Sequence, residues 1–163
     1  MGTSLTDRGL EALKRIKVVE TLSLGNVAVT DAGLSQIEHL TALRMLYLGR
    51  TQITDAGLVH LHNLKQLTDL DVQSTRISDV GLLELERVKS LQRLNIHECN
   101  VTLDGVRRFQ MAVPSCDVTW LIISSRQELE AWRKDGDEGV LEFRRTHDPT
   151  DDRRAVPFVI RSD

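Results

Sequence analysis

The chain has 163 residues, a formal net charge of −3 and 40% hydrophobic residues, so its length and composition suit one compact unit with a continuous core. Up to residue 120 the chain carries 13 Lys and Arg against 14 Asp and Glu, and the remainder carries 8 against 10. Neither part therefore has the concentrated positive stripe of a nucleic-acid-binding protein, and we expect no nucleic-acid partner.

The sequence carries no signal for export or membrane insertion. Its first ten residues lack the basic start and apolar run of a secretory signal, and no stretch approaches the roughly 20 apolar residues that span a bilayer. Two cysteines, Cys99 and Cys116, are too few for a disulfide framework. We expect a cytoplasmic protein with reduced thiols and no membrane partner.

A 24-residue segment occurs five times in succession without insertion or deletion. Its first residue recurs as Leu5, Val29, Ile53, Ile77 and Val101. Within one repeat the apolar spacing changes: Leu58, Leu61 and Leu64 fall three apart, whereas Leu70 and Val72 fall two apart. Each repeat is therefore predicted to contain one short helix and one short strand.

Equal repeats of this kind stack into a solenoid. Successive strands, such as those at 69–73 and 93–97, should pair in register as a parallel sheet. Helices are wider than strands are spaced, so the stack should curve, with the sheet on the concave side and the helices on the convex side. The strand–helix–strand crossovers predict a right-handed solenoid.

A hydroxyl residue begins each predicted helix, where it can accept hydrogen bonds from free backbone N–H groups. These residues are Thr6, Thr30, Thr54, Ser78 and Thr102. An Asp follows in four of five repeats and should favour the helix dipole, whereas the fifth repeat has Leu103 and then Asp104. A recurring glycine indicates that each helix lies too close to its neighbour for a Cβ atom. The glycines are Gly9, Gly33, Gly57, Gly81 and Gly105.

The two ends of the repeat array differ. The outer face of the first repeat, with Leu10, Leu13 and Ile16, has no evident polar cap. After the last repeat, Ser125 to Glu128 resembles a capping box that opens a helix through about Arg133. Strands are predicted from Val140 to Arg144 and from Val156 to Ile160. We predict a solenoid over residues 1–122 and a C-terminal α+β cap over residues 123–163.

The repeat pattern L-x-x-L-x-L-x-x-[TC]-x-[IV]-[TS]-D-x-G-L resembles that of the leucine-rich-repeat family over residues 5 to about 122. It is most similar to the subclass with Thr or Cys after the strand, here Thr51, Thr75 and Cys99, although Val27 departs. Similar repeats occur in F-box-type substrate receptors and in bacterial proteins. The resemblance implies an α/β solenoid that binds other proteins.

Side chains that alternate with the buried strand residues should face outward on the concave side. The candidate partner-binding residues are Tyr47, Asp69, Asp71, Gln73, Arg93, Asn95 and His97. In register, Asp69 should lie beside Arg93, and Asp71 between Tyr47 and Asn95. Such a set could orient a protein or peptide with Tyr47 as its anchor. An alternative is that the same residues form a cross-strand ion pair on a solvated surface.

Two other functions fit parts of the sequence. A structural building block would associate with a second copy, or with further repeats, through the uncapped N-terminal edge. A hydrolase would use Asp69 and Asp71, because side chains two apart on a strand lie roughly 6.6 Å apart, within the range that glycosidases use. An open face keeps both carboxylates hydrated, and Arg93 would hold Asp69 ionised. We therefore expect no catalytic residues and no enzyme.

No cofactor or metal site is expected. His60 and His62 lie two apart on a predicted helix, so they point in different directions and are interpreted as solvent-facing. Cys99 occupies a position where neighbouring repeats have Thr, which favours a small buried side chain over a ligand.

Overall fold

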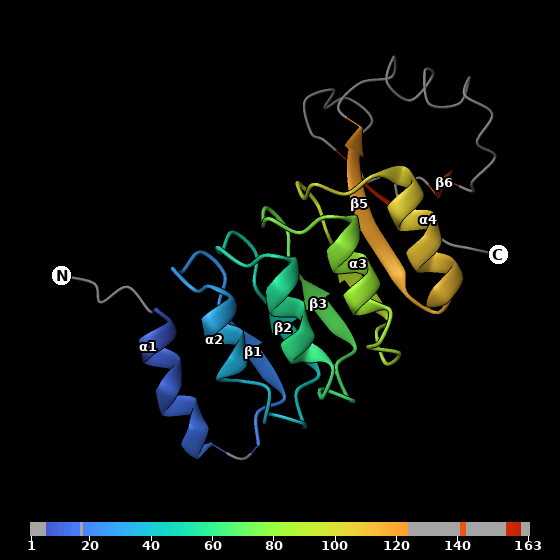
Figure 1. Cartoon of the computed structure of the whole chain (residues 1–163). Helices are drawn as coiled ribbons and strands as arrows, with labels where there is room; N and C mark the ends of the chain where they lie inside the picture. The colour runs from blue at the N-terminus through green and yellow to red at the C-terminus, as the bar shows by residue number, and fades with distance from the viewer. Residues whose placement is uncertain (1–5, 17, 124–140, 143–155, 161–163) are drawn as a thin grey trace.

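The computed structural model describes residues 6–16, 18–123, 141–142 and 156–160 (Figure 1). Its strands are β1 (Thr21–Ser23), β2 (Met45–Tyr47), β3 (Asp69–Asp71), β4 (Arg93–Asn95), β5 (Asp117–Ile123), β6 (Leu141–Glu142) and β7 (Val156–Ile160). Its helices are α1 (Asp7–Leu10), η1 (Glu11–Arg15), α2 (Asp31–Ser35), η2 (Asp55–Leu61), α3 (Asp79–Leu85) and α4 (Leu103–Ala112). Both η elements are 3₁₀ helices. The helices form one layer and the sheet another, which is the predicted α/β solenoid (Figure 1).

The first five strands pair in parallel and in chain order, as predicted. Each strand is displaced by one repeat from its neighbour, so Leu22, Leu46, Leu70, Leu94 and Val118 form one row across the sheet. From Leu46 onward every member of this row is at most 2% exposed. The row therefore lies in the core between the sheet and the helices.

The hydroxyl caps were predicted correctly for four of the five repeats. Thr30, Thr54, Ser78 and Thr102 each accept a hydrogen bond from a backbone N–H group two or three residues later. Thr6 makes no such bond.

The aspartate that follows each N-cap residue was predicted to interact with the helix dipole, but it also has a second role. Its carboxylate accepts hydrogen bonds from the N-cap residue of the following repeat. The N–H and hydroxyl of Thr54 donate to Asp31 at 2.8 and 2.6 Å, and those of Thr102 donate to Asp79 at 2.8 and 2.7 Å. The same two bonds join Thr30 to Asp7 and Ser78 to Asp55. We call this row of contacts the aspartate ladder.

The recurring glycines make room for the aspartate ladder. A Cβ atom at Gly33, Gly57, Gly81 or Gly105 would lie 2.2 to 2.4 Å from Oδ1 of the aspartate in the preceding repeat. Contacts this short do not occur between non-bonded atoms, so a side chain at these positions would displace the carboxylate. The predicted close approach is confirmed, and the group that approaches is the carboxylate.

The sheet continues beyond the repeats with two antiparallel strands. β7 pairs with β5, and β6 pairs with β7, so the sheet order is β1-β2-β3-β4-β5-β7-β6. The strand predicted over 156–160 is confirmed, and the described part of the one predicted over 140–144 is β6. The helix predicted over 125–133 lies outside the described residues. The domain boundary after residue 122 and the capping role of residues 123–163 stay predictions.

At the N-terminal edge, the prediction that Leu10 is uncovered is wrong. Leu10 is 1% exposed and Leu13 is partly buried, whereas Ile16 is 42% exposed. A Cβ atom at Gly33 in α2 would lie 3.0 Å from Cδ1 of Leu10, which places the second repeat against this leucine. Among these three residues, Ile16 is therefore the one with an exposed side chain.

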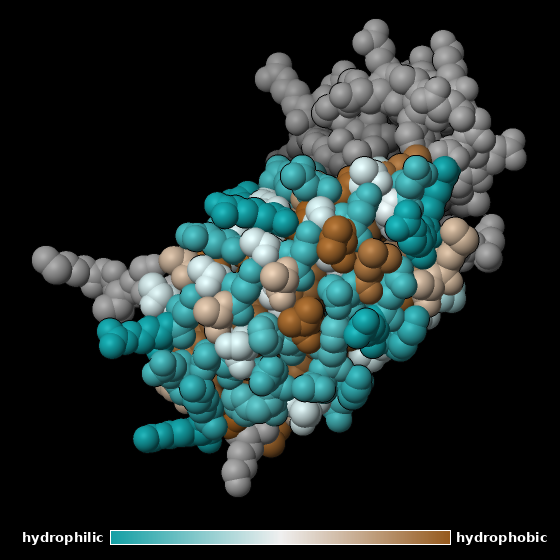
Figure 2. Space-filling model, viewed as in Figure 1, coloured by the Kyte–Doolittle hydropathy of each residue, from teal (hydrophilic) through white to brown (hydrophobic). Residues whose placement is uncertain are grey.

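The helix layer presents a mostly hydrophilic surface that is interrupted by separate hydrophobic patches (Figure 2). Exposed apolar side chains of this layer include Val59 of η2 and Val80 and Leu83 of α3. None of the helices in the described part of the chain has the length and apolarity needed to cross a bilayer.

Candidate binding surface

The seven predicted partner-binding residues lie in β2, β3 and β4 or just after β3 and β4. We call their outward side the sheet face, defined by Tyr47, Asp69, Asp71, Gln73, Arg93, Asn95 and His97. Register places Asp69 opposite Arg93, and Asp71 opposite both Tyr47 and Asn95. All three predicted juxtapositions are confirmed. Tyr47 and Arg93 are exposed and the other five are half-buried.

Arg93 and Asp69 form the ion pair of the sheet face. The arginine Nε donates to Oδ1 of Asp69, and the hydroxyl of Thr68 donates to Oδ2 at 2.7 Å. Partial burial raises the pKa of Asp69, but hydrogen bonds from Arg93 and Thr68 and the charges of Arg93 and Arg44 outweigh it, so the pKa is lowered. Asp69 is therefore ionised at neutral pH, as the sequence predicted.

Asp71 and Asn95 each accept a hydrogen bond from the backbone two residues later in the chain. Oδ1 of Asp71 accepts from the backbone N–H of Gln73 at 2.9 Å, and Oδ1 of Asn95 accepts from that of His97 at 3.1 Å. These bonds shape the turn after each strand. Each side chain keeps one further polar atom for a ligand, the second carboxylate oxygen or the amide NH₂.

Tyr47 is the large aromatic side chain of the sheet face and is 37% exposed. Among the described residues, its hydroxyl donates to a soft acceptor, Sδ of Met45, at 3.7 Å. A thioether is a weak acceptor, so this contact leaves the phenol able to exchange it for a stronger partner. Tyr47 thus offers an apolar ring and a polar tip at one place.

Two further polar residues lie beside the predicted set. The hydroxyl of Ser74 donates to Oε2 of Glu98, and Oε1 of Glu98 lies 3.6 Å from Nε2 of His97. The Ser74 hydrogen bond, followed by the charge of His97, lowers the pKa of Glu98. Ser74 and Glu98 occupy one repeat position, where Asn26 and Arg50 also have positive φ angles. A residue in this left-handed conformation does not follow the alternating side-chain directions of a strand. The alternation of apolar and polar residues therefore did not predict Ser74 and Glu98 as members of this surface.

The arrangement gives no support to hydrolysis by Asp69 and Asp71. A glycosidase of this kind needs one carboxylic acid that keeps its proton at working pH. The pKa of Asp69 is lowered by Arg93 and Thr68 rather than raised, which does not suit that role. Nothing in the described residues points to catalysis.

Two histidines of the helix layer, His60 and His62, connect neighbouring repeats. His60 contacts Glu38 of the preceding repeat at 3.0 Å, and His62 contacts Glu84 of the following one at 3.2 Å. They point apart as predicted, but they are half-buried between repeats rather than simply solvent-facing. Among the described residues, no three His, Cys, Asp or Glu side chains are placed to hold a metal ion.

Both cysteines are free. Cys99 is half-buried rather than fully buried, and its Sγ donates to the carbonyl of Val72 at 3.1 Å. Burial, followed by the charges of Asp117 and Asp69, raises the pKa of the buried Cys116 to about 12. Its thiol stays protonated at neutral pH.

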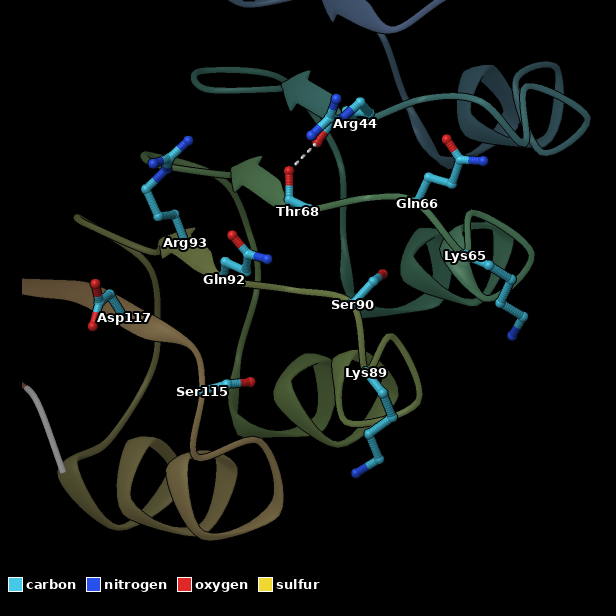
Figure 3. A pocket seen from close by; sticks show the side chains of 10 residues that line it. All are labelled: Arg44, Lys65, Gln66, Thr68, Lys89, Ser90, Gln92, Arg93, Ser115 and Asp117. Carbon is cyan, nitrogen blue, oxygen red and sulfur yellow. Dashed lines mark hydrogen bonds between the residues drawn. The ribbon is translucent and has the colours of Figure 1, made fainter. Parts of the chain in front are cut away.

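A hollow of about 660 Å³ lies where the chain passes from the helices into β2, β3, β4 and β5. We call it the loop-side groove. Its basic lining residues are Arg44, Lys65, Lys89 and Arg93 (Figure 3). The charge counts over residues 1–120 and 121–163 did not reveal this cluster, because its members come from three different repeats. Reading the sequence in repeat columns reveals part of it, since Lys65 and Lys89 lie 24 residues apart.

Comparison with known proteins supports the repeat assignment. The family model described as "Leucine Rich repeat" matches residues 63–85, which is about one repeat of the solenoid. A search of curated proteins gave no significant match.

Solved structures share the fold at low sequence identity. Internalin C2 of Listeria monocytogenes is 22% identical, with a TM-score of 0.55, over 67% of this chain and 44% of that one. The chain therefore spans less than half the length of that protein. Leiomodin-1 actin-binding site 2 is 15% identical, with a TM-score of 0.57, over 83% of this chain and 100% of that one. Such identities establish a shared fold and nothing more specific.

Proposed function

Because the chain is a solenoid of leucine-rich repeats, we propose that it is a protein-interaction module that binds a protein or peptide on its sheet face. The observation that carries this proposal is the exposed Tyr47 in the row next to the Asp69–Arg93 ion pair. An aromatic anchor beside charged groups is the composition of an interface hot spot.

The chemistry of the sheet face suits a polar partner. Tyr47 buries a large ring at low cost in conformational entropy, because its side chain has few rotatable bonds. Asp71 and Asn95 would each supply one further polar atom toward the partner. Arg93, whose side chain is 68% exposed, would orient an acidic or carbonyl group.

The fold has a precedent for protein binding. The leiomodin-1 structure that shares it is described as an actin-binding site. This likeness supports a binding role for the solenoid and leaves the identity of the partner open.

The direct test is quantitative binding of a partner recovered by pull-down with the full chain. We expect Tyr47→Ala combined with Arg93→Ala to weaken the complex by at least about tenfold, because both changes remove a proposed anchor. The melting temperature should change little, since an exposed ion pair contributes about 0 to 1 kcal/mol.

A matched control removes an exposed apolar residue and an exposed arginine from the helix side. Met111→Ala with Arg87→Ala does this, because both side chains are exposed and lie away from the sheet face. The control should bind like the original protein. Unchanged binding by the Tyr47 and Arg93 variant would rule out the sheet face as the binding surface.

A second candidate function is a building block that associates through its N-terminal edge. It is favoured by the exposure of Ile16 at 42% and Val18 at 70%, both in the first repeat.

Mass measurement in dilute solution separates the two candidates. A building block should form dimers or larger assemblies that Val18→Asp disrupts and Met111→Asp leaves intact. A single monomeric species over the whole concentration range would argue against association. A charge at Leu10 is not a fair test, because this residue is buried and the variant would lose stability.

A further inference from the structure

We propose that the loop-side groove is a second binding site, which holds an acidic peptide segment of a partner protein. The groove runs across the segments that lead into four neighbouring strands, away from the anchor Tyr47. Four basic side chains line it against one acidic side chain, Asp117, in a protein whose net charge is −3. This local excess of positive charge is the first argument for an acidic ligand.

The basic groups are largely available to a ligand. Arg44 and Lys65 are exposed and form no ion pair with any carboxylate among the described residues. Lys89 donates to the backbone carbonyl of Ala112 at 2.9 Å, which leaves its charge uncompensated. Arg93 is paired with Asp69. Three of the four cations therefore lack a carboxylate partner in the described structure.

The middle of the groove carries neutral polar groups rather than further charge. Thr68, Ser90 and Gln92 lie between the charged side chains, with Lys65 and Lys89 on the right of the view and Arg93 on the left (Figure 3). Hydroxyl and amide groups match the N–H and C=O groups of a peptide main chain.

The spacing of the repeats also suits an extended chain. Neighbouring strands lie about 4.8 Å apart, whereas an extended peptide advances about 3.3 Å per residue. Acidic side chains two residues apart on one side of such a peptide are about 6.6 Å apart, which is more than the strand spacing, so the long side chains of Lys65 and Lys89 would take up the difference.

A peptide fits the groove better than a nucleic acid does. Single-stranded nucleic acids are held by aromatic side chains that stack on the bases, and the lining contains none. Asp117 in the lining would repel a regular phosphate backbone, whereas a peptide can place a neutral residue opposite it. The groove therefore favours carboxylates presented at intervals.

The test uses the full chain and a fluorescein-labelled decapeptide of alternating Glu and Ser, followed by fluorescence anisotropy. We expect saturable binding that weakens as salt is raised, and no binding of the same peptide with Gln in place of Glu. Lys65→Glu combined with Lys89→Glu should weaken binding at least tenfold. Circular dichroism confirms that the variants stay folded, since both residues are exposed.

The control reverses two charges outside the groove, Lys14→Glu with Arg76→Glu, which are equally exposed. It should keep binding within about twofold of the original protein, since neither residue lines the groove. Equal loss in the control, or no binding of the Glu-Ser peptide, would overturn the proposal. Tighter, Lys65-dependent binding of a single-stranded oligonucleotide would overturn the choice of ligand.

Arg93 belongs to both surfaces, so variants that leave it unchanged separate the two proposals. Tyr47→Ala alone tests the sheet face, and Lys65→Glu with Lys89→Glu tests the groove. Loss of peptide binding in one variant and of partner binding in the other would identify two separate surfaces.

Discussion

At the scale of single residues, one aspartate per repeat fastens each layer of the solenoid to the next. Asp79 illustrates the contact, because both of its oxygens accept hydrogen bonds from Thr102, and Gly105 leaves space for the carboxylate. The fifth repeat has Leu103 at the equivalent position. The aspartate ladder therefore ends with the repeats.

The ladder predicts that substitutions at Gly105 and Asp79 are strongly coupled. A Cβ atom at Gly105 would lie 2.2 Å from Oδ1 of Asp79, and its three nearest atoms would all belong to this aspartate. Gly105→Ala should reduce the free energy of unfolding by about 2 to 4 kcal/mol, because it breaks two charge-assisted hydrogen bonds. In an Asp79→Ala background the same change should be neutral or stabilising by up to about 1 kcal/mol, because alanine favours a helix.

Urea denaturation of the two single variants and the double variant measures this coupling directly. Simple additivity of the two effects would contradict the ladder, because it would mean that the carboxylate does not occupy the space beside Gly105.

The ion pair of the sheet face predicts a pH-dependent stability. The folded-state pKa of Asp69 is lowered, so its contribution is present above the pKa of the unfolded state and is lost as the pH falls through the folded pKa. Arg93→Ala should raise the pKa of Asp69, as measured by NMR titration of its carboxyl carbon. The stability difference between original and variant should be about 0 to 1 kcal/mol at pH 7 and should vanish between about pH 5 and pH 2. If the stability difference between the two proteins stayed constant over this pH range, the Asp69–Arg93 ion pair would not be its source.

At the scale of elements, the repeat period determined the strands and most of the helices. The 24-residue spacing of apolar residues predicted five strands in parallel register, because a one-residue slip would expose Leu70 and its row. The third repeat forms the 3₁₀ helix η2 where its neighbours form α-helices. Apolar spacing does not separate these two, since both bury residues three apart.

The candidate site was predicted less completely than the strands. Alternation placed Tyr47, Asp69 and Arg93 correctly on one face. It could not reveal that Asp71 would bond to its own turn, or that Glu98 would adopt a left-handed conformation. These features depend on the local path of the chain after each strand, which apolar periodicity does not encode.

The turn after each strand predicts the cost of removing a buried hydroxyl. Thr51 is 7% exposed and its Oγ1 donates to the carbonyl of Leu48 at 2.7 Å. Thr51→Val keeps the shape but removes this donor, so it should reduce the free energy of unfolding by about 1 to 3 kcal/mol. Thr41→Val, the same change at an exposed position, should stay within about 0.5 kcal/mol of the original protein. Equal effects in urea titrations would show that the buried bond contributes nothing.

At the scale of the whole molecule, the two ends of the parallel sheet differ. The edge of β5 is paired with β7, whereas β1 is the outermost strand of the described sheet. Exposed Ile16 and Val18 lie near the β1 end. The building-block proposal therefore concerns the β1 edge, whereas the sheet face and the loop-side groove lie along the side of the repeats.

The sheet-face proposal makes one prediction that depends on no change in affinity. A photo-crosslinking phenylalanine analogue at position 47 keeps an aromatic ring on the sheet face, and the same analogue at position 111 places it on the helix side. Illumination of the complex with its recovered partner should give a covalent product from position 47 and none from position 111. A product from position 111 and none from position 47 would show that the partner binds the helix layer, and would contradict the proposed function.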